Sequence, residues 1–498
     1  MDVPEFRIDK LRNGRTRVAA LVEDEVYAYS KIGDVLTVCG WAKTIRKQGG
    51  GAFAFLALND GSSHKNLQVM VTKESCENYE DVVKSGTGAS FRIVGTLEKS
   101  PAEGQLVELK VTDSSIHSAV VLGRCPADKY PLAKKKHGRE FLREIAHLRP
   151  RSYLIGVVAR VRSQMAMATH TFFQTQGFQY IHTPLITSAD CEGAGEMFQV
   201  TTALPESNKM ADVKTVKDKG YEVDYKKDFF GRKAFLTVSG QLAVENYCCA
   251  LSDVYTFGPT FRAENSHTSR HLAEFWMIEP EVAFADLEVN MELAEKFVKY
   301  LVQWAMKHCA ADLDWLNSNE EIGLKARLEQ VVQSDFARLP YFDAVKLLIS
   351  HSESGQVTFT EKPFEGMDMA SEHERYLTEK VYEKPLIVYN YPKEFKAFYM
   401  KANDDGRTVK AMDVLVPKIG ELIGGSEREN DLEKLDAMMK EKEVDAKSLW
   451  WYRDLRTYGS VPHSGFGLGF ERLVMFITGV ENIRDVIPYP RFPGHAEF

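Results

Sequence analysis

The sequence predicts an α+β protein in which a small N-terminal β-barrel precedes a larger domain of helices around an antiparallel sheet. Two observations carry this prediction. Residues 35–116 hold short apolar runs separated by turn signals, whereas residues from 152 onward mix long helical periods with strand-like segments. A chain of 498 residues with 44% apolar residues has enough material for more than one hydrophobic core. The expected division is a barrel domain with an N-terminal extension at 1–125, a hinge at 126–150 and a second domain at 151–498.

Composition and charge restrict the location and the partners. No apolar run approaches the roughly 20 residues that cross a bilayer, and the N-terminus has no apolar signal-peptide core. The seven cysteines are scattered without a C-x-x-C pair, which is typical of a reducing compartment. We therefore expect a cytoplasmic protein that does not bind membranes. A net charge of -8 means that any binding to a polyanion must depend on local basic patches.

The barrel prediction rests on five strand-like runs with turn signals such as Asn59-Asp60-Gly61 between them. Five short strands favour a small barrel of the kind that binds oligonucleotides, although such a barrel can also serve packing or dimer contact. The runs are residues 35–38, 54–58, 67–71, 91–94 and 106–109.

The hinge is basic and irregular, and it includes Lys134-Lys135-Lys136. Such a lysine run is either solvated surface or a contact along a phosphate backbone.

The second domain begins with a helical period from Ser152 to Gly177, followed by a strand that ends at Pro184. A second helix is expected behind Asp286 as its N-cap. Strands are expected at 235–238, 254–261 and 274–284, with neighbouring strands antiparallel. Residues 205–233 have seven lysines against six acidic residues, and we interpret them as a surface insertion without assigned chemistry.

Three polar segments stand out in this domain, although each one alone is a weak signal. A glycine-rich run can be a close contact between a helix and a strand, and an Arg-x-Glu pair on a strand is often a surface ion pair. The segments are Gly177–Pro184, Phe261–Glu264 with the loop to His271 and Phe275, and Gly465–Arg472.

In this order and spacing the three segments resemble the signature motifs of class II aminoacyl-tRNA synthetases. Residues 188–198, 237–242, 270–276 and 458–463 resemble asparaginyl-tRNA synthetases rather than their aspartyl or lysyl relatives. The resemblance implies an N-terminal OB-fold that binds the tRNA anticodon and a class II catalytic domain. It also implies an antiparallel sheet of six to seven strands flanked by helices, and a homodimer built partly by the first motif.

The chemistry of amino-acid activation needs no general base, because the attacking carboxylate is already ionised. The enzyme must hold this nucleophile in line and neutralise the charge that develops on the α-phosphate and pyrophosphate. By resemblance, Arg262 contacts the α-phosphate, Glu264 the adenine amino group and His271 the distal phosphates. Phe275 and Arg472 stack on the two adenine faces, and Arg472 also reaches the γ-phosphate. Guanidinium suits phosphate because its fork of donors stays charged. The expected ATP-binding residues are Arg262, Glu264, His271, Leu272, Phe275, Glu421, Gly469 and Arg472, of which Arg262, His271 and Arg472 are the catalytic candidates.

Magnesium prefers hard oxygen ligands. The segment Asp413–Glu421 resembles the acidic strand of the family, which makes Glu421 the main expected Mg²⁺ ligand and Asp413 a second. Aspartyl relatives commonly carry a serine where this chain has Gly424, so water is expected to replace one side-chain ligand.

Asparagine and aspartate are nearly isosteric, so their discrimination depends on hydrogen-bond polarity and charge. Arg428 matches the arginine that holds the side-chain oxygen in both enzymes. Aspartyl enzymes carry a lysine at the position of Val244, and Glu279 lies where it would accept from an amide and repel a carboxylate, so we expect asparagine. The residues expected around its α-amino and carboxylate groups are Glu192, Ser239 and Gln241.

On the barrel, Arg46, Phe55 and Gln68 match family positions that contact the anticodon. Stacking on an aromatic ring and edge contacts from Gln and Arg are usual in recognition of single-stranded RNA. The alternative for Phe55 is a side chain in the barrel core.

The sequence thus favours ligation of L-asparagine to tRNA(Asn), with ATP and Mg²⁺. Three alternatives remain: an aspartyl or dual-specificity synthetase, a paralogue that makes asparagine from the adenylate and ammonia, and a catalytically silent RNA-binding paralogue. The barrel argues against the second, and the intact set of Arg262, Glu264, Glu421 and Arg472 argues against the third.

Overall fold

The computed structural model describes residues 14–132, 135, 137–190, 196–204, 206–207, 209, 212–216 and 222–498. Contacts divide the chain into two compact units, Met1–Val161 with Cys309–Ile322 and Arg162–His308 with Gly323–Phe498. Within the described ranges, no helix is both long enough and apolar enough to span a bilayer.

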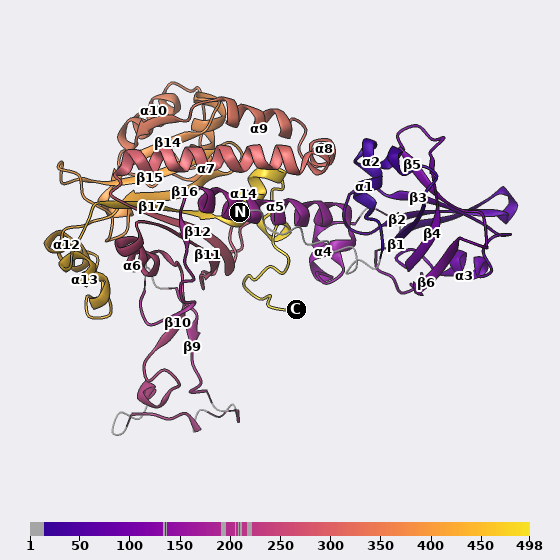
Figure 1. Ribbon diagram of the computed structural model, residues 1–498. Helices are drawn as coiled ribbons and strands as arrows, with labels where there is room; N and C mark the ends of the chain where they lie inside the picture. Colours follow the sequence, from indigo (N-terminus) through magenta and orange to yellow (C-terminus); the bar gives the residue numbers. More distant parts are fainter. Residues whose placement is uncertain are drawn as a thin grey trace. The chain divides into compact units, whose positions relative to one another are not determined.

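The first unit contains a closed β-barrel (Figure 1). Its sheet has the strand order β1-β2-β3-β5-β4-β6, and a further pairing of β1 with β4 closes it. The five predicted runs overlap β1 to β5, which confirms the predicted barrel, and β6 adds a strand that was not predicted. The strands are β1 (Val35–Gln48), β2 (Phe53–Asn59), β3 (Leu67–Thr72), β4 (Ser90–Lys99), β5 (Val107–Val111) and β6 (Ser118–Gly123).

Alternation along these strands forms the barrel core, because successive side chains point to opposite faces of a strand. In β2 and β3, Leu56 and Val69 are fully buried while their neighbours Phe55 and Gln68 keep part of their surface exposed. The short helices of this unit are α1 (Val18–Val22), α2 (Glu25–Ser30), α3 (Tyr79–Lys84) and α4 (Arg139–Glu144).

The first unit also includes α8 (Ala310–Asn319), which comes from much later in the chain. Asp312 on α8 accepts hydrogen bonds from Nη2 (2.6 Å) and Nε (2.8 Å) of Arg160. Arg160 also donates through Nη1 to the Gly61 carbonyl at 2.9 Å, and His64 Nδ1 lies 3.6 Å from Asp312. A barrel loop, the start of α5 and α8 are therefore joined by one polar cluster.

The second unit is built on an eight-stranded sheet with the order β13-β14-β15-β16-β17-β12-β11-β7. The six strands from β14 to β11 pair antiparallel, as predicted. The two edge strands, β7 and β13, each pair in parallel with their neighbour in the sheet. A parallel pair needs a long crossover connection, and helices in the chain between β7 and β11 and between β13 and β14 belong to these crossovers. The strands are β7 (Gln179–Tyr180), β11 (Asp253–Phe261), β12 (Glu274–Ala283), β13 (Ala337–Pro340), β14 (Leu386–Pro392), β15 (Thr408–Val416), β16 (Gly420–Glu427) and β17 (His463–Gly469).

The two predicted long helices are present. Helix α5 (Tyr153–Thr175) ends just before Gly177, whose φ of 89° is the left-handed conformation that commonly terminates a helix. Helix α7 (Leu287–His308) begins after Asp286, which accepts from the Val289 amide at 3.0 Å. The other helices are α6 (Gln241–Leu251), α9 (Leu324–Gln333), α10 (Tyr341–Glu353), α11 (Ser371–Tyr376), α12 (Leu432–Glu441), α13 (Trp450–Thr457) and α14 (Phe470–Thr478).

A small three-stranded sheet lies beside the large one and leads into the insertion. It consists of β8 (Ile186–Thr187), β10 (Ala234–Leu236) and β9 (Gln199–Val200). Figure 1 shows the described residues between β9 and β10 projecting away from the body of the second unit. Hydrogen bonds tie the base of this projection to the end of β11, from the Phe261 amide to the Thr237 carbonyl (2.9 Å) and from the Ala263 amide to the Glu196 carbonyl (2.7 Å).

Candidate active site

A pocket of about 180 Å³ lies in the second unit, beside the middle of the sheet. The loop between β11 and β12, the strands β12, β16 and β17 and the start of α14 contribute its walls. All eight residues predicted to bind ATP line this pocket, so the second and third sequence motifs meet there with the segment that ends at Glu421, whereas no residue of the first motif, Gly177–Pro184, lines it. The lining residues are Arg262, Glu264, Arg270, His271, Leu272, Phe275, Met277, Glu421, Leu422, Gly467, Gly469, Glu471, Arg472 and Ile483.

Arg262 and Phe275 face each other across the hairpin of β11 and β12. The Arg262 amide donates to the Ala273 carbonyl at 2.9 Å, which closes the loop that bears His271. The guanidinium carbon of Arg262 lies 5.4 Å from the centre of the Phe275 ring, a cation–π distance. A planar cation and an aromatic ring are thus held at one wall of the pocket.

Arg472 and Glu421 line the same pocket. Arg472 Nη1 donates to the Glu421 carbonyl and to its carboxylate, both at 3.1 Å. Burial alone would raise the pKa of Glu421, but the Arg472 and Lys396 cations more than offset it, so the pKa lies below its ordinary value. Glu421 therefore stays ionised at neutral pH.

His271 is held by the loop itself, since its Nδ1 lies 2.5 Å from Thr268 Oγ1 and 3.0 Å from Ser266 Oγ. Partial burial, together with the nearby cations of Arg472 and Arg262, lowers the pKa of His271, and Glu264 opposes that shift. His271 is accordingly a neutral hydrogen-bonding group at pH 7. The sequence did not assign Arg270, although its segment was part of the resemblance, and it lines the same pocket.

Asp413 is not among the residues that line the pocket. Both of its carboxylate oxygens accept from Lys396 Nζ, at 3.0 and 2.7 Å. It pairs in register with Gly424, and a Cβ at Gly424 would lie 3.0 Å from Glu421 Oε1 and 3.5 Å from Asp413 Oδ1. The glycine therefore leaves room between the two carboxylates. Within the described residues, no three acidic, histidine or cysteine side chains are close enough to hold a metal ion by themselves.

Glu374 is an acidic residue near Glu421 that the sequence did not predict. Its Oε2 accepts from the Glu421 amide at 3.0 Å. Burial, and then the negative charges of Glu421 and Asp413, raise the pKa of Glu374 to about 8. Helix α11, which carries Glu374, has no recognisable motif that would have identified it.

The residues predicted to bind the amino acid continue from this pocket along β12. Because side chains alternate, Phe275, Met277, Glu279 and Glu281 share one face of the strand. Ser239 Oγ donates to Glu279 Oε1, and the Gly240 amide donates to Glu279 Oε2 at 2.9 Å. A Cβ at Gly240 would meet Thr183, Thr256 and Glu279, so glycine is needed for this approach.

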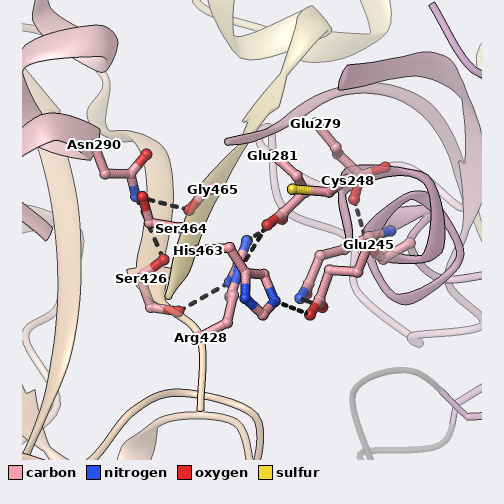
Figure 2. A network of polar contacts seen from close by, with 12 residues as sticks. Glu245, Cys248, Glu279, Glu281, Asn290, Ser426, Arg428, His463, Ser464 and Gly465 are labelled. Carbon is pink, nitrogen blue, oxygen red and sulfur yellow. Dashed lines mark hydrogen bonds and ion pairs between the residues drawn. The ribbon is translucent and has the colours of Figure 1, made fainter. Parts of the chain in front are cut away.

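Arg428 lies at the far end of that row and is buried with Glu281 (Figure 2). Its Nε donates to Glu281 Oε2 at 3.1 Å and its Nη2 to Oε1 at 2.5 Å, while Nη1 donates to Ser426 Oγ at 2.9 Å. A Cβ at Gly465 would lie 2.3 Å from Glu281 Oε1, so the glycine-rich run makes space for this carboxylate.

Gln241 contacts a second buried carboxylate, Glu245, through Nε2 at 2.8 Å. Glu245 also accepts from Arg456 Nη2 (3.0 Å) and Tyr452 (2.8 Å), and His463 Nε2 lies 2.7 Å from it. Burial alone would raise the pKa of Glu245. The interactions with Arg456 and His463 outweigh burial, so the pKa of Glu245 lies below its ordinary value. The sequence did not predict this cluster, although a Gln and a Glu four residues apart on an apolar helix were a usable signal.

Val244 is fully buried in an apolar cluster with Cys248 and Val254. Glu192, the remaining predicted contact of the amino acid, lies outside the described residues.

The three predicted anticodon residues share one region of the barrel surface. Arg46 on β1 lies directly opposite Phe55 on β2, and Gln68 on β3 is paired with Ala57, two residues further along. Phe55 is not part of the buried core; its ring packs edge-on against Phe53 with centroids 5.5 Å apart. Gln68 Nε2 donates to Glu108 at 3.0 Å.

Comparison with known proteins matches both units to described families. Residues 36–116 match the OB-fold nucleic acid binding domain, and residues 139–493 match the class II tRNA synthetases (D, K and N). A protein named asparagine–tRNA ligase from Treponema denticola is 52% identical over 482 residues, which are 96% of this chain and 99% of that protein. The chain belongs to the asparagine–tRNA ligase family of class II synthetases.

Further asparagine–tRNA ligases agree with this placement. The chloroplastic/mitochondrial enzyme of Arabidopsis thaliana is 51% identical over 503 residues, covering 100% of this chain and 85% of that protein. The crystal structure of Pyrococcus horikoshii asparaginyl-tRNA synthetase complexed with asparaginyl-adenylate has a TM-score of 0.79 and 30% identity, covering 94% of this chain and 97% of that one. The resemblance to asparaginyl-tRNA synthetases, and with it the predicted fold class, is confirmed.

Proposed function

We propose that the chain ligates L-asparagine to tRNA(Asn) in two steps. ATP first activates asparagine as an enzyme-bound adenylate, and the 3′-terminal adenosine of tRNA then takes the asparaginyl group. The observation that carries this proposal is the continuous row along β12, from the pocket residue Phe275 through Glu279 to the Arg428–Glu281 pair. Nucleotide and amino acid would lie side by side on that row.

The residues of the pocket suit the activation step. The asparagine carboxylate attacks the α-phosphate directly, so the protein must supply position and positive charge. Arg262 would bind the α-phosphate and His271 the distal phosphates. Phe275 and Arg472 would stack on the two faces of the adenine, with Arg472 also reaching the γ-phosphate and Glu264 at the adenine amino group. Leu272 and Gly469 complete the pocket wall.

Magnesium fits this site through Glu421. Mg²⁺ usually takes one or two carboxylates together with substrate phosphates and water, and Glu421 is an ionised carboxylate at the pocket wall. When bound there with ATP, the ion would offset phosphate charge. Asp413 already binds Lys396 through both oxygens, which leaves it the weaker candidate.

The choice of asparagine follows from the charges around Arg428. Glu281 already neutralises Arg428, so the pair can hold a neutral amide oxygen without demanding a carboxylate. Glu279 adds a negative group beside the same site, which would accept from the amide nitrogen and repel aspartate. Val244 lies in an apolar cluster where an aspartyl enzyme would carry a lysine, which further disfavours aspartate.

The partners and the organisation follow from the same assignment. The proposed domains are the barrel at 1–125, the hinge at 126–150 and the catalytic domain at 151–498, with Arg46, Phe55 and Gln68 binding the tRNA(Asn) anticodon. A homodimer is supported by exposed apolar side chains near the first motif, such as Leu251 (50% exposed) and Phe284 (74% exposed). A cytoplasmic location accords with the free thiols at Cys39, Cys76 and Cys125.

Amino-acid-dependent exchange of pyrophosphate into ATP tests this function directly, with asparagine and aspartate compared side by side. Exchange with asparagine alone is the expected result. Glu279→Gln should narrow the preference for asparagine by about ten-fold or more, because it removes the repelling charge. Exchange with aspartate in the unaltered protein would overturn the specificity, and exchange with neither would overturn the catalytic assignment.

A further inference from the structure

The described part of the insertion carries a compact turn at residues 225–233, which we call the aromatic turn. Phe229 and Phe230 at its centre are 76% and 43% exposed. Their rings meet edge-on, with centroids 4.8 Å apart and an angle of 78° between the planes. Adjacent exposed rings are costly in water and often mark a binding surface.

The turn is held in place by Asp228. Its carboxylate accepts from Thr201 Oγ1 (2.6 Å), Thr202 Oγ1 (2.7 Å), the Thr202 amide (2.9 Å) and the Phe229 amide (2.8 Å). These hydrogen bonds lower the pKa of Asp228 far below its usual range. The conformation that presents Phe229 to solvent is therefore fixed by specific contacts.

Cations flank the two rings on both sides. Lys226 and Lys227 precede them and Arg232 and Lys233 follow, and all four side chains are exposed. The carboxylate within residues 225–233 belongs to Asp228, whose hydrogen bonds are used inside the turn. Aromatic rings interleaved with cations are typical of surfaces that bind single-stranded nucleic acid, whereas protein interfaces are depleted of lysine.

The base of the insertion lies next to the candidate active site. The Ala263 amide, one residue after Arg262, donates to the Glu196 carbonyl, and the Leu236 amide donates to the Phe198 carbonyl at 2.9 Å. Phe229 is seven residues before Leu236, which places it within about 25 Å of that base even in a fully extended chain. On the proposed function, the macromolecule that must reach this pocket is tRNA, and its 3′ end is single-stranded.

We propose that the aromatic turn binds an unpaired nucleotide at the acceptor end of tRNA, with its base stacked on Phe229 or Phe230 and its phosphates near Lys226 and Arg232. The contact serves tRNA binding and leaves asparagine activation untouched. The proposal rests on the function proposed above. Transcript binding tests the aromatic turn, whereas asparagine-dependent pyrophosphate exchange tests the function, so the two proposals can be contradicted separately.

Equilibrium binding of a tRNA(Asn) transcript tests the proposal with the full-length protein. The double variant Phe229→Ala, Phe230→Ala should bind the transcript at least about ten-fold more weakly, with unchanged asparagine-dependent pyrophosphate exchange. Phe364→Ala is the matched control, since Phe364 is also an exposed phenylalanine of the second unit (63%) and should change neither quantity. With a transcript that lacks the unpaired 3′ nucleotides, the unaltered protein and the double variant should bind equally.

Single substitutions separate stacking from general apolar contact. Phe229→Tyr keeps a ring and should bind like the unaltered protein, whereas Phe229→Leu should lose affinity as the alanine variant does. Lys226→Gln with Arg232→Gln should reduce the slope of affinity against salt, because fewer phosphate contacts release fewer counterions.

Several outcomes would overturn the assignment. The first is that the double variant binds the full transcript as tightly as the unaltered protein does. The second is that the double variant loses the same affinity for the shortened transcript as for the full one, which would place the contact elsewhere on tRNA. A parallel loss of pyrophosphate exchange would show that the rings support the fold. Weaker dimers with unchanged RNA binding would assign the turn to a second copy of the chain. Failure of the proposed function itself differs from all of these, since the unaltered protein would then show no asparagine-dependent exchange.

Discussion

Glu281 holds Arg428 through two nitrogens although 147 residues separate them in the chain. The guanidinium is 3% exposed and the carboxylate is fully buried, so each charge depends on the other. Ser426 and the absence of a side chain at Gly465 complete the arrangement. The pair turns a buried arginine into a fixed and nearly neutral hydrogen-bond donor.

Removing one partner of this pair should therefore lower the free energy of unfolding substantially. Glu281→Gln removes the carboxylate that is hydrogen-bonded to the buried Arg428 guanidinium, and we expect a loss of about 3–5 kcal/mol in the free energy of unfolding. Chemical denaturation followed by circular dichroism measures it. The control is Asp436→Asn, which breaks the half-exposed pair with Arg453 and should cost no more than about 1 kcal/mol. Equal losses in both variants would contradict the role given to burial.

The phosphate site gives a second prediction. Arg262→Ala should lower asparagine-dependent pyrophosphate exchange by at least about a hundred-fold, because it removes a charged donor at the α-phosphate. The far-ultraviolet spectrum and the melting temperature should stay near those of the unaltered protein. Near-normal exchange in this folded variant would remove Arg262 from the site.

The third prediction concerns Phe55 on the barrel surface. Phe55→Ala should raise the KM for tRNA by about ten-fold and spare pyrophosphate exchange, because the partly exposed ring is placed to stack a base beside Arg46. Phe91→Ala is an instructive contrast, since Phe91 is fully buried and its loss should destabilise the barrel by about 3–5 kcal/mol. If Phe55→Ala impaired activation as much as charging, the side chain would be structural.

The raised pKa of Glu374 predicts that the stability of the folded protein depends on pH. Its pKa of about 8 in the folded protein lies above its ordinary value of 4.5, so the folded state holds more protons between these two pH values. The stabilisation from the protonated carboxyl is complete below about pH 4.5 and is lost as the pH rises through about 8. The melting temperature of the unaltered protein should therefore fall relative to that of Glu374→Gln as the pH is raised from 5 to about 8.

A control keeps this pH prediction specific. Glu443→Gln changes an exposed glutamate and should leave the pH profile of the melting temperature as it is in the unaltered protein. Parallel profiles for the unaltered protein and Glu374→Gln would show that Glu374 is ionised throughout that range.

The parts of this molecule that the sequence predicted are those with a local signature. Short apolar runs between turn signals predicted the barrel strands, the N-cap at Asp286 predicted the start of α7, and the second and third motifs predicted the pocket. The strand β6 has a short apolar run, Ala119–Leu122, that could have been recognised.

The parts that were not predicted depend on contacts between distant segments. Glu281, Glu245 and Glu374 are ordinary acidic residues until folding surrounds them with a particular cation, tyrosine or second carboxylate. The parallel pairing of the edge strands β7 and β13 likewise depends on which strand lies beside them, and nothing in a strand of two to four residues specifies its partner.

The polar cluster of Arg160, His64 and Asp312 bears on how the chain acquires its structure during translation. The barrel strands leave the ribosome early and can pair at once, since domains fold largely in the order of their synthesis. Helix α8 is synthesised only after much of the second unit. Arg160, which also bonds the loop at Gly61, therefore cannot form its hydrogen bonds to Asp312 until then. The nascent N-terminal unit is consequently incomplete for a large part of elongation, and a fragment released by cleavage within residues 126–150 would lack that helix for good.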